Sequence, residues 1–111
     1  MRLQRSGEFA ETRRLGRRLA RGCVILNWRP RPDLTHSRLG VVTSRRLGSA
    51  VVRSRARRLL REAFRQLQPQ IQPPSDVVLV ARTSIKEQDG RDVRRQVETA
   101  LRHARLLPKS S

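Results

Sequence analysis

The sequence predicts a small α+β domain, a sandwich in which helices pack against one β-sheet. Residues 49–66 place their apolar side chains at helical spacing, which indicates a long amphipathic helix. Residues 22–28 and 76–82 are shorter apolar runs rich in β-forming residues, which indicates strands. The expected order along the chain is helix, two or three strands, helix, strand, helix.

The first helix is predicted to begin at Ser6 and to end at Gly16, with Glu8 in its first turn. Residues 1–5 precede it as a basic arm. Phe9 is the only aromatic residue on this helix, and it suits a core anchor and a stacking platform equally well. A basic cluster follows, made of Arg13, Arg14, Arg17, Arg18 and Arg21.

Two strands are predicted next, over residues 22–28 and 38–44. Pro30 and Pro32 end the first strand because proline cannot donate to a β-ladder. The connecting loop is short, so we expect these two strands to pair as a hairpin. Alternation divides the first strand into two faces, with Cys23, Ile25 and Asn27 on one and Val24, Leu26 and Trp28 on the other.

The central helix is predicted to begin after an N-cap at Ser49 and to end near Gln68–Pro69. Its apolar stripe is Val52, Ala56, Leu59, Leu60, Ala63, Phe64 and Leu67. Arginines cover much of the remaining surface: Arg53, Arg57 and Arg61 along one flank, Arg58 and Arg65 beside them, and Arg55 toward the far side. Glu62 is the only acidic residue of this helix. Like charges at i, i+4 spacing repel, which favours a polyanionic partner over a merely solvated face.

Residues 76–82 form a continuous apolar run, which predicts a strand buried on both faces. A last helix is expected to open near Asp89, and residues 108–111 form a frayed tail. If the strands before and after the central helix share one sheet, a right-handed crossover is the general expectation. The buried stripe of the last helix is predicted to be Val93, Val97, Ala100, Leu101 and Ala104.

Length and charge bound the function. At 111 residues the chain is predicted to be a single domain, 1–111. It carries 26 Lys and Arg against 9 Asp and Glu, a formal net charge of +17. Such a balance indicates a nucleic acid or an anionic surface as partner.

Several classes of protein lack support in the sequence. Cys23 is the only cysteine, which excludes an intrachain disulfide and fits a reducing compartment. Neither a membrane-spanning apolar run nor a signal peptide is evident, so we expect a soluble cytoplasmic protein. His36 and His103 are isolated, and no metal site or nucleophile motif is predicted. Asp89 and Asp92 suit the charged N-terminus of a helix better than a metal pair.

Residues 41–64, with the sequence VVTSRRLGSAVVRSRARRLLREAF, strongly resemble the bacterial ribonuclease P protein subunit. In that family a strand ending in Ser and two basic residues leads into an Arg-Asn-Arg helix. The resemblance extends over nearly the whole chain, since residues 6–9 match the family's Ser-x-x-Phe and residues 76–82 its Asp-hydrophobic-Ala-Arg strand. It implies a protein cofactor of an endonuclease that removes the 5′ leader from precursor tRNA.

The resemblance also implies two groups of site residues. Contacts to the catalytic RNA are expected from Arg45, Arg46, Arg53, Ser54, Arg55, Arg57, Arg58 and Arg61. Ser54 stands where the family has Asn, and a serine offers fewer hydrogen bonds and a shorter reach. A cleft between the first helix and the sheet is expected to hold the leader, lined by Phe9, Arg13, Ile25 and Asn27. Aromatic residues are usual in the family where Arg13 and Asn27 stand.

For the fold, the resemblance implies a left-handed βαβ crossover and a likeness to a ribosomal-protein domain. The catalytic site is expected in the RNA, with Mg²⁺ held mainly by RNA phosphates and no organic cofactor. The expected partners are the catalytic RNA and precursor tRNA, with no DNA and no membrane. The alternatives are a ribosomal protein or general RNA chaperone, a DNA-binding transcription factor and, with least support, a protein-only nuclease.

Overall fold

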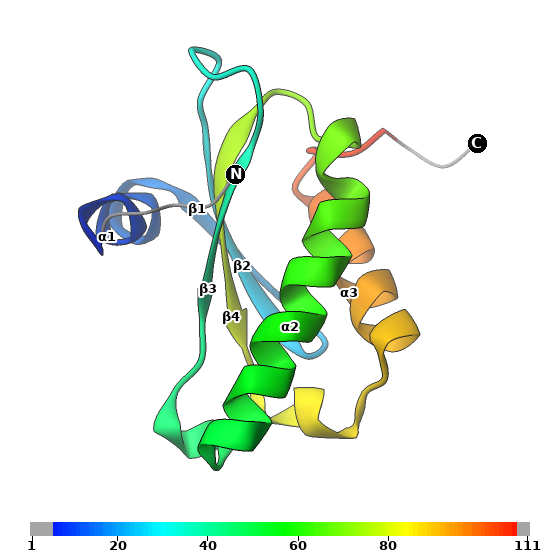
Figure 1. Cartoon of the computed structure of the whole chain (residues 1–111). Coiled ribbons are helices and arrows are strands. Elements are labelled where there is room, and N and C mark those ends of the chain that lie inside the picture. Colours follow the sequence, from blue (N-terminus) through cyan, green and yellow to red (C-terminus); the bar gives the residue numbers. More distant parts are fainter. Residues whose placement is uncertain (1–5, 109–111) are drawn as a thin grey trace.

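Four strands form one sheet in the order β1-β2-β4-β3 (Figure 1). The computed structural model describes residues 6–108, with side chains from Ala10 onward, so the predicted basic arm and most of the predicted tail lie outside the described residues. Strand β2 pairs antiparallel with β1 and with β4, and β4 pairs parallel with β3. The strands are β1 (Arg17–Arg21), β2 (Val24–Pro30), β3 (Arg38–Val42) and β4 (Ser75–Ala81).

The helices form the two outer layers. Helix α1 (Ser6–Leu15) covers part of one sheet face, whereas α2 (Ala50–Leu67) and α3 (Gly90–His103) cover the other (Figure 1). Short 3-10 turns join the elements: η1 (Arg45–Leu47), η2 (Gln68–Gln70) and η3 (Thr83–Glu87). The predicted α+β class and order of elements are therefore confirmed, with three strands before the central helix.

The predicted hairpin between residues 22–28 and 38–44 is wrong. The hairpin partner of β2 is β1, across a tight turn at Gly22 and Cys23. Gly22 has a φ of 57°, a conformation that favours glycine, and a side chain there would also collide with Gln96. Strand β1 is not predicted from the sequence, because its arginine-rich residues include no β-branched or aromatic side chain that would indicate a strand.

The crossover from β3 through α2 to β4 is left-handed. In Figure 1, β3 lies in front of β4, both strands run downward, and α2 returns upward on the right. For a viewer who looks along β3 and β4 from their N-terminal ends, the path from β3 through α2 to β4 therefore turns counter-clockwise. The general expectation of a right-handed crossover is wrong here, and the hand implied by the family resemblance is the one present.

The core lies between the sheet and the pair α2 and α3. The predicted stripes of both helices face it, and Leu60, Leu67, Val93 and Leu101 are fully buried. Strand β4 is buried along nearly its whole length on both faces, as predicted. The predicted grouping of Cys23 with Ile25 and Asn27 is wrong, because Cys23 lies in the β1–β2 turn and joins the core, where burial raises the pKa of its thiol.

Local capping fixes where the two core-facing helices begin. The Ser49 hydroxyl accepts a hydrogen bond from the Val52 amide, which confirms the predicted N-cap of α2. Asp89 and Asp92 form a reciprocal capping box at the start of α3, which confirms their prediction as helix N-terminal charges. Within residues 6–108, no helix is both long and apolar enough to span a membrane.

Candidate nucleic-acid interface

The arginine-bearing side of α2 is held against the edge of the sheet at β3. The Arg57 guanidinium donates to Thr43 Oγ1, just after β3, at 2.9 Å and to Ser54 Oγ, one turn back on α2, at 3.0 Å. Two hydroxyl groups therefore fix the plane of this guanidinium while it stays partly exposed. A guanidinium oriented in advance loses less side-chain entropy when it binds a phosphate.

Neighbouring arginines extend this surface. Arg53 and Arg61 share the flank of Arg57 and are half-buried, and Arg58 is exposed further round the helix. Arg45 and Arg46 are exposed in η1, directly before α2. We call this set of arginines, with Ser54, the α2 surface: Arg45, Arg46, Arg53, Ser54, Arg57, Arg58 and Arg61.

Arg55 is predicted with this group but lies on the opposite flank of α2. Its guanidinium donates to the carbonyl oxygen of Gln88 at 2.6 Å and to that of Ile85 at 3.5 Å. These bonds fasten α2 to the segment that joins β4 to α3. The structure therefore separates Arg55 from Arg57, although only one residue stands between them.

The residues of the second predicted site, beside α1, also differ in their exposure and position. Asn27 is only 3 % exposed, whereas Ile25 is partly exposed and Arg13 is exposed. Glu11 of α1 forms an ion pair with Arg29 of β2 at 3.2 Å. Residues two positions apart on a helix project about 200° apart. Arg13 therefore projects from the opposite flank of α1, toward the end of the sheet that carries Ile25.

That end of the sheet is left open by α1. Its floor includes the half-buried side chains of Ile25, Val42 and Val80, aligned across β2, β3 and β4. Exposed arginines surround it: Arg13 on α1, Arg18 on β1 and Arg82 directly after β4. Arg18 and Arg82 are not predicted at this site from the sequence, because charge is their only signal. The Phe9 side chain lies outside the described residues.

Most of the described acidic side chains have internal partners. The buried carboxylate of Asp76, 2 % exposed, accepts two hydrogen bonds from Arg38, of 2.7 and 2.8 Å, and one from Arg31, of 3.0 Å. Hydrogen bonds from Arg65 and Gln66 lower the pKa of Glu62 to about 2. Asp33, Asp92 and Glu98 each pair with an arginine as well. Among the described residues, no three His, Cys, Asp or Glu side chains come together as a metal site.

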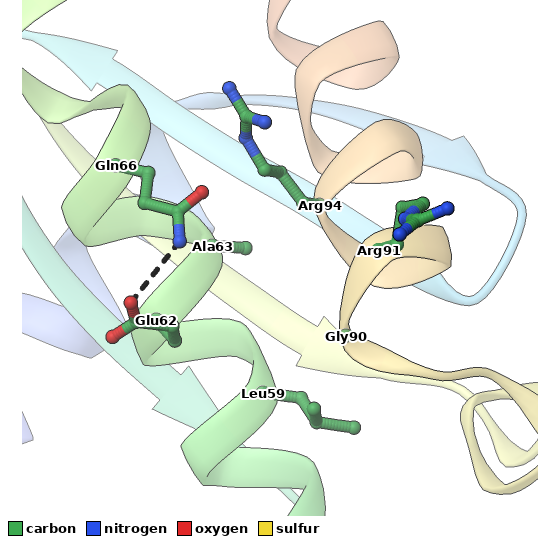
Figure 2. A pocket seen from close by; sticks show the side chains of 7 residues that line it. All are labelled: Leu59, Glu62, Ala63, Gln66, Gly90, Arg91 and Arg94. Carbon is green, nitrogen blue, oxygen red and sulfur yellow. Dashed lines mark hydrogen bonds between the residues drawn. The ribbon is translucent and has the colours of Figure 1, made fainter.

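A groove of about 280 Å³ lies between α2 and α3, on the side of α2 away from Arg57 (Figure 2). Leu59 and Ala63 line it from α2, and Leu59 points across toward Gly90. Glu62 and Gln66 are hydrogen-bonded to each other on its wall at 3.1 Å. Arg91 and Arg94 stand exposed along α3, across this groove from Glu62, and offer control positions for experiments on charge.

Comparison with known proteins identifies the family. The family model described as Ribonuclease P matches residues 1–105. The chain belongs to the ribonuclease P protein family. The ribonuclease P protein component of Roseiflexus sp. (strain RS-1) is 40 % identical over 110 residues, covering 98 % of this chain and 89 % of that one. That of Geobacillus kaustophilus is 32 % identical over 108 residues, covering 97 % and 89 %.

Solved structures of ribonuclease P proteins share the fold. The Thermotoga maritima protein is 27 % identical, with a TM-score of 0.82 over 93 % of this chain and 96 % of that one. The Staphylococcus aureus protein, at 24 % identity, has a TM-score of 0.86 over 96 % and 97 %. Membership of the ribonuclease P protein family confirms the resemblance drawn from residues 41–64 and makes the chain a component of an endoribonuclease involved in tRNA processing. The likeness to a ribosomal-protein domain stays a prediction.

Proposed function

We propose that this chain binds the catalytic RNA of ribonuclease P through the α2 surface and the 5′ leader of precursor tRNA through the open sheet face beside α1. The catalytic site then lies in the RNA, and the protein assists endonucleolytic removal of the leader. The observation that carries this proposal is the Arg57 guanidinium, held by Thr43 and Ser54 and still partly exposed. We expect the assembly to work in the cytoplasm, without binding DNA or a membrane.

The α2 surface suits the backbone of a folded RNA. Guanidinium groups bind phosphate oxygens through paired hydrogen bonds, and contacts to phosphate fix register without reading sequence. Because Ser54 supports Arg57, the serine in place of the family's asparagine retains a role in this surface even with its shorter reach. The α2 surface therefore supplies positively charged groups in defined orientations.

The open face beside α1 suits a single strand. Its aliphatic floor can contact sugars and bases without selecting among them, and Arg13, Arg18 and Arg82 can reach phosphates. Trp28 and Phe64 both face the core and are at most 8 % exposed, so neither offers a stacking surface. Apart from Phe9, whose side chain lies outside the described residues, recognition of the leader should therefore depend on its backbone more than on its sequence.

Among the described residues, no cluster of carboxylates suits a Mg²⁺ site. Asp33, Glu62, Asp76 and Glu98 are engaged with arginines, and Asp89 and Asp92 cap α3. We therefore propose that Mg²⁺ is held by the RNA partner and assign no reaction step to the protein. The contribution of the protein is to screen repulsion between the phosphates of catalytic RNA and substrate.

The test of the α2 surface is cleavage of precursor tRNA by a bacterial ribonuclease P RNA at low Mg²⁺, with and without the protein. We expect stoichiometric protein to restore cleavage and Arg57→Glu/Arg61→Glu to abolish this effect. Arg91→Glu/Arg94→Glu is the matched control, because it makes the same charge change on α3. Failure of the wild-type protein to restore cleavage, despite tight binding to unrelated RNAs, would favour a general RNA chaperone. Cleavage by the protein alone would overturn the placement of the catalytic site in the RNA.

The test of the leader site compares two ligands of the assembled ribonucleoprotein. Arg13→Gln should weaken binding of precursor tRNA several-fold and leave binding of mature tRNA unchanged, because only the precursor carries a leader. Arg94→Gln removes one exposed arginine from the other face and should change neither affinity. An equal loss for both ligands with Arg13→Gln would contradict a leader site beside α1.

A further inference from the structure

A second basic surface lies at the opposite edge of the sheet from the α2 surface. Arg14 belongs to the last turn of α1, and Arg17 and Arg18 begin β1, with all three side chains exposed. We call these three residues the β1-edge strip. Gly16 holds α1 close to the sheet here, since a side chain at this position would collide with the carbonyl oxygens of Thr12 and Trp28. Arg18 pairs with Asn27 and projects on the α1 face of the sheet, whereas Arg17 pairs with Trp28 and projects on the other face. The strip therefore runs around the β1 edge at the junction of α1 and β1.

Among the described side chains, none neutralises this strip. Within the part of the chain that the structure describes, Arg14, Arg17 and Arg18 form no ion pair, and the nearest acid along the chain, Glu11, is taken by Arg29. By contrast, Arg21 at the other end of β1 contacts the ring of His103 at 2.8 Å. Three unpaired guanidinium groups within five residues repel one another unless an anion binds them.

The backbone adds a second feature. Strand β1 is an outer strand that pairs only with β2, so its outward amides have no partner strand. Such an edge can donate main-chain hydrogen bonds to phosphate oxygens, as amides do in many nucleic-acid complexes. The strip therefore offers charged groups on both faces of the β1 edge and backbone donors along the edge itself.

We propose that the β1-edge strip binds phosphates of the leader upstream of the stretch that lies on the open face beside α1. This proposal rests on the proposed function, because it needs the leader to cross that face. Arg18 joins the two regions, since it projects from β1 on the same face as Ile25 and the strip begins there. The outer strands of a four-stranded sheet lie about 14 Å apart. A strand of RNA must therefore extend across the whole sheet to reach the strip.

The predicted ligand of the β1-edge strip is single-stranded RNA, bound without preference for sequence. The described strip has no aromatic side chain on which a base could stack, so its contacts are electrostatic. Only precursors with leaders long enough to reach β1 should gain affinity from it. The affinity of the assembled ribonucleoprotein for precursor tRNA should therefore rise with leader length in two stages.

The experiment measures that affinity for a series of leader lengths with the wild-type protein and with Arg14→Gln/Arg17→Gln, which leaves Arg18 of the open face intact. We expect the variant to bind short-leader precursors as the wild type does and to bind long leaders about tenfold more weakly. For long leaders, the slope of log affinity against log salt should fall by about 1.4, at about 0.7 for each phosphate neutralised. Arg91→Gln/Arg94→Gln removes the same charge elsewhere and should change neither quantity. Arg14→Lys/Arg17→Lys should retain most of the wild-type slope.

The outcomes separate this inference from the function on which it rests. If wild-type affinity does not depend on leader length at all, the leader site itself is wrong. If it does, but the strip variant behaves like the α3 control, the β1-edge strip has no role in binding. Charged residues also protect exposed sheet edges from aggregation. A strip that serves only this purpose would change solubility and leave the salt slope intact, which would likewise overturn the proposal.

Discussion

Arg55 and Arg57 show how two arginines of the same motif are given different tasks by their neighbours. Arg57 is held by the hydroxyls of Thr43 and Ser54 on the side of β3, whereas Arg55 binds the carbonyls of Ile85 and Gln88 on the side of α3. Helical geometry predicts from the sequence that the two side chains point in different directions. The sequence does not reveal which groups each guanidinium contacts, because Thr43 and Gln88 are brought next to α2 only by tertiary structure.

The hydroxyl pair around Arg57 can be tested directly. Ser54→Ala combined with Thr43→Val should weaken binding of the catalytic RNA roughly 5- to 30-fold, since each hydrogen bond contributes about 1 kcal/mol. Circular dichroism should show an unchanged fold because both side chains lie outside the core. Thr99→Val is the control, as the Thr99 hydroxyl bonds only to the Arg95 carbonyl of its own helix. RNA affinity equal to wild type would mean that Arg57 needs no positioning.

Arg55 is expected to matter for stability. Arg55→Gln should lower the free energy of unfolding by about 1–2 kcal/mol, because two carbonyl oxygens lose a charged donor. Arg58→Gln changes an exposed arginine one turn further along and should leave stability within about 0.5 kcal/mol. Urea unfolding followed by circular dichroism measures both values. Equal stability of the two variants would argue against an anchoring role for Arg55.

Among the elements, the two amphipathic helices are predictable from sequence and the sheet pairing is not. The stripes and caps of α2 and α3 are local properties of sequence, and the structure confirms them. Pairing between β3 and β4 joins residues that are separated in the chain by a whole helix, so no local sequence pattern indicates it. The short loop after β2 suggests a hairpin, but β4 occupies that side of β2 instead.

The N-terminus of α3 provides a test that depends on pH. The Asp92 amide hydrogen bond lowers the pKa of Asp89, so folding favours its charged form. The stabilisation is therefore present above the unfolded pKa of about 3.9 and is lost as pH falls through the lower folded value. Asp89→Ala should reduce the melting temperature at neutral pH by on the order of 5 °C. The difference from wild type should shrink below about pH 3, and a constant difference would contradict the capping role.

At the scale of the whole molecule, α1 is the one described helix on one sheet face, while two helices cover the other (Figure 1). This imbalance leaves the half-buried floor of Ile25, Val42 and Val80 beside α1. From sequence, the family resemblance names Arg13, Ile25 and Asn27 as one group. The structure places Asn27 among buried residues because its strand position falls where the sheet is covered.

The overall charge predicts a strong dependence of RNA binding on salt. Engagement of six to ten phosphates by the α2 surface would reduce affinity by roughly 10³ to 10⁵ between 50 and 200 mM salt. Arg57→Gln/Arg61→Gln should flatten this dependence by about one unit of slope for each phosphate that is no longer bound. Filter binding or fluorescence anisotropy over a salt series measures it. A shallow slope for the wild type would exclude binding dominated by phosphate contacts.

The internal pairing of acidic side chains affects how stable the protein is in the cell when no RNA is bound to it. Because Asp76 and most other described acids are already paired with arginines, little acidic charge among the described residues is left to compensate the formal net charge of +17. Mutual repulsion then lowers the stability of the solitary protein, and an RNA that binds only the folded form restores it by mass action. Copies made in excess of the RNA would unfold more often and be degraded sooner. The supply of RNA would thus set the abundance of its protein partner.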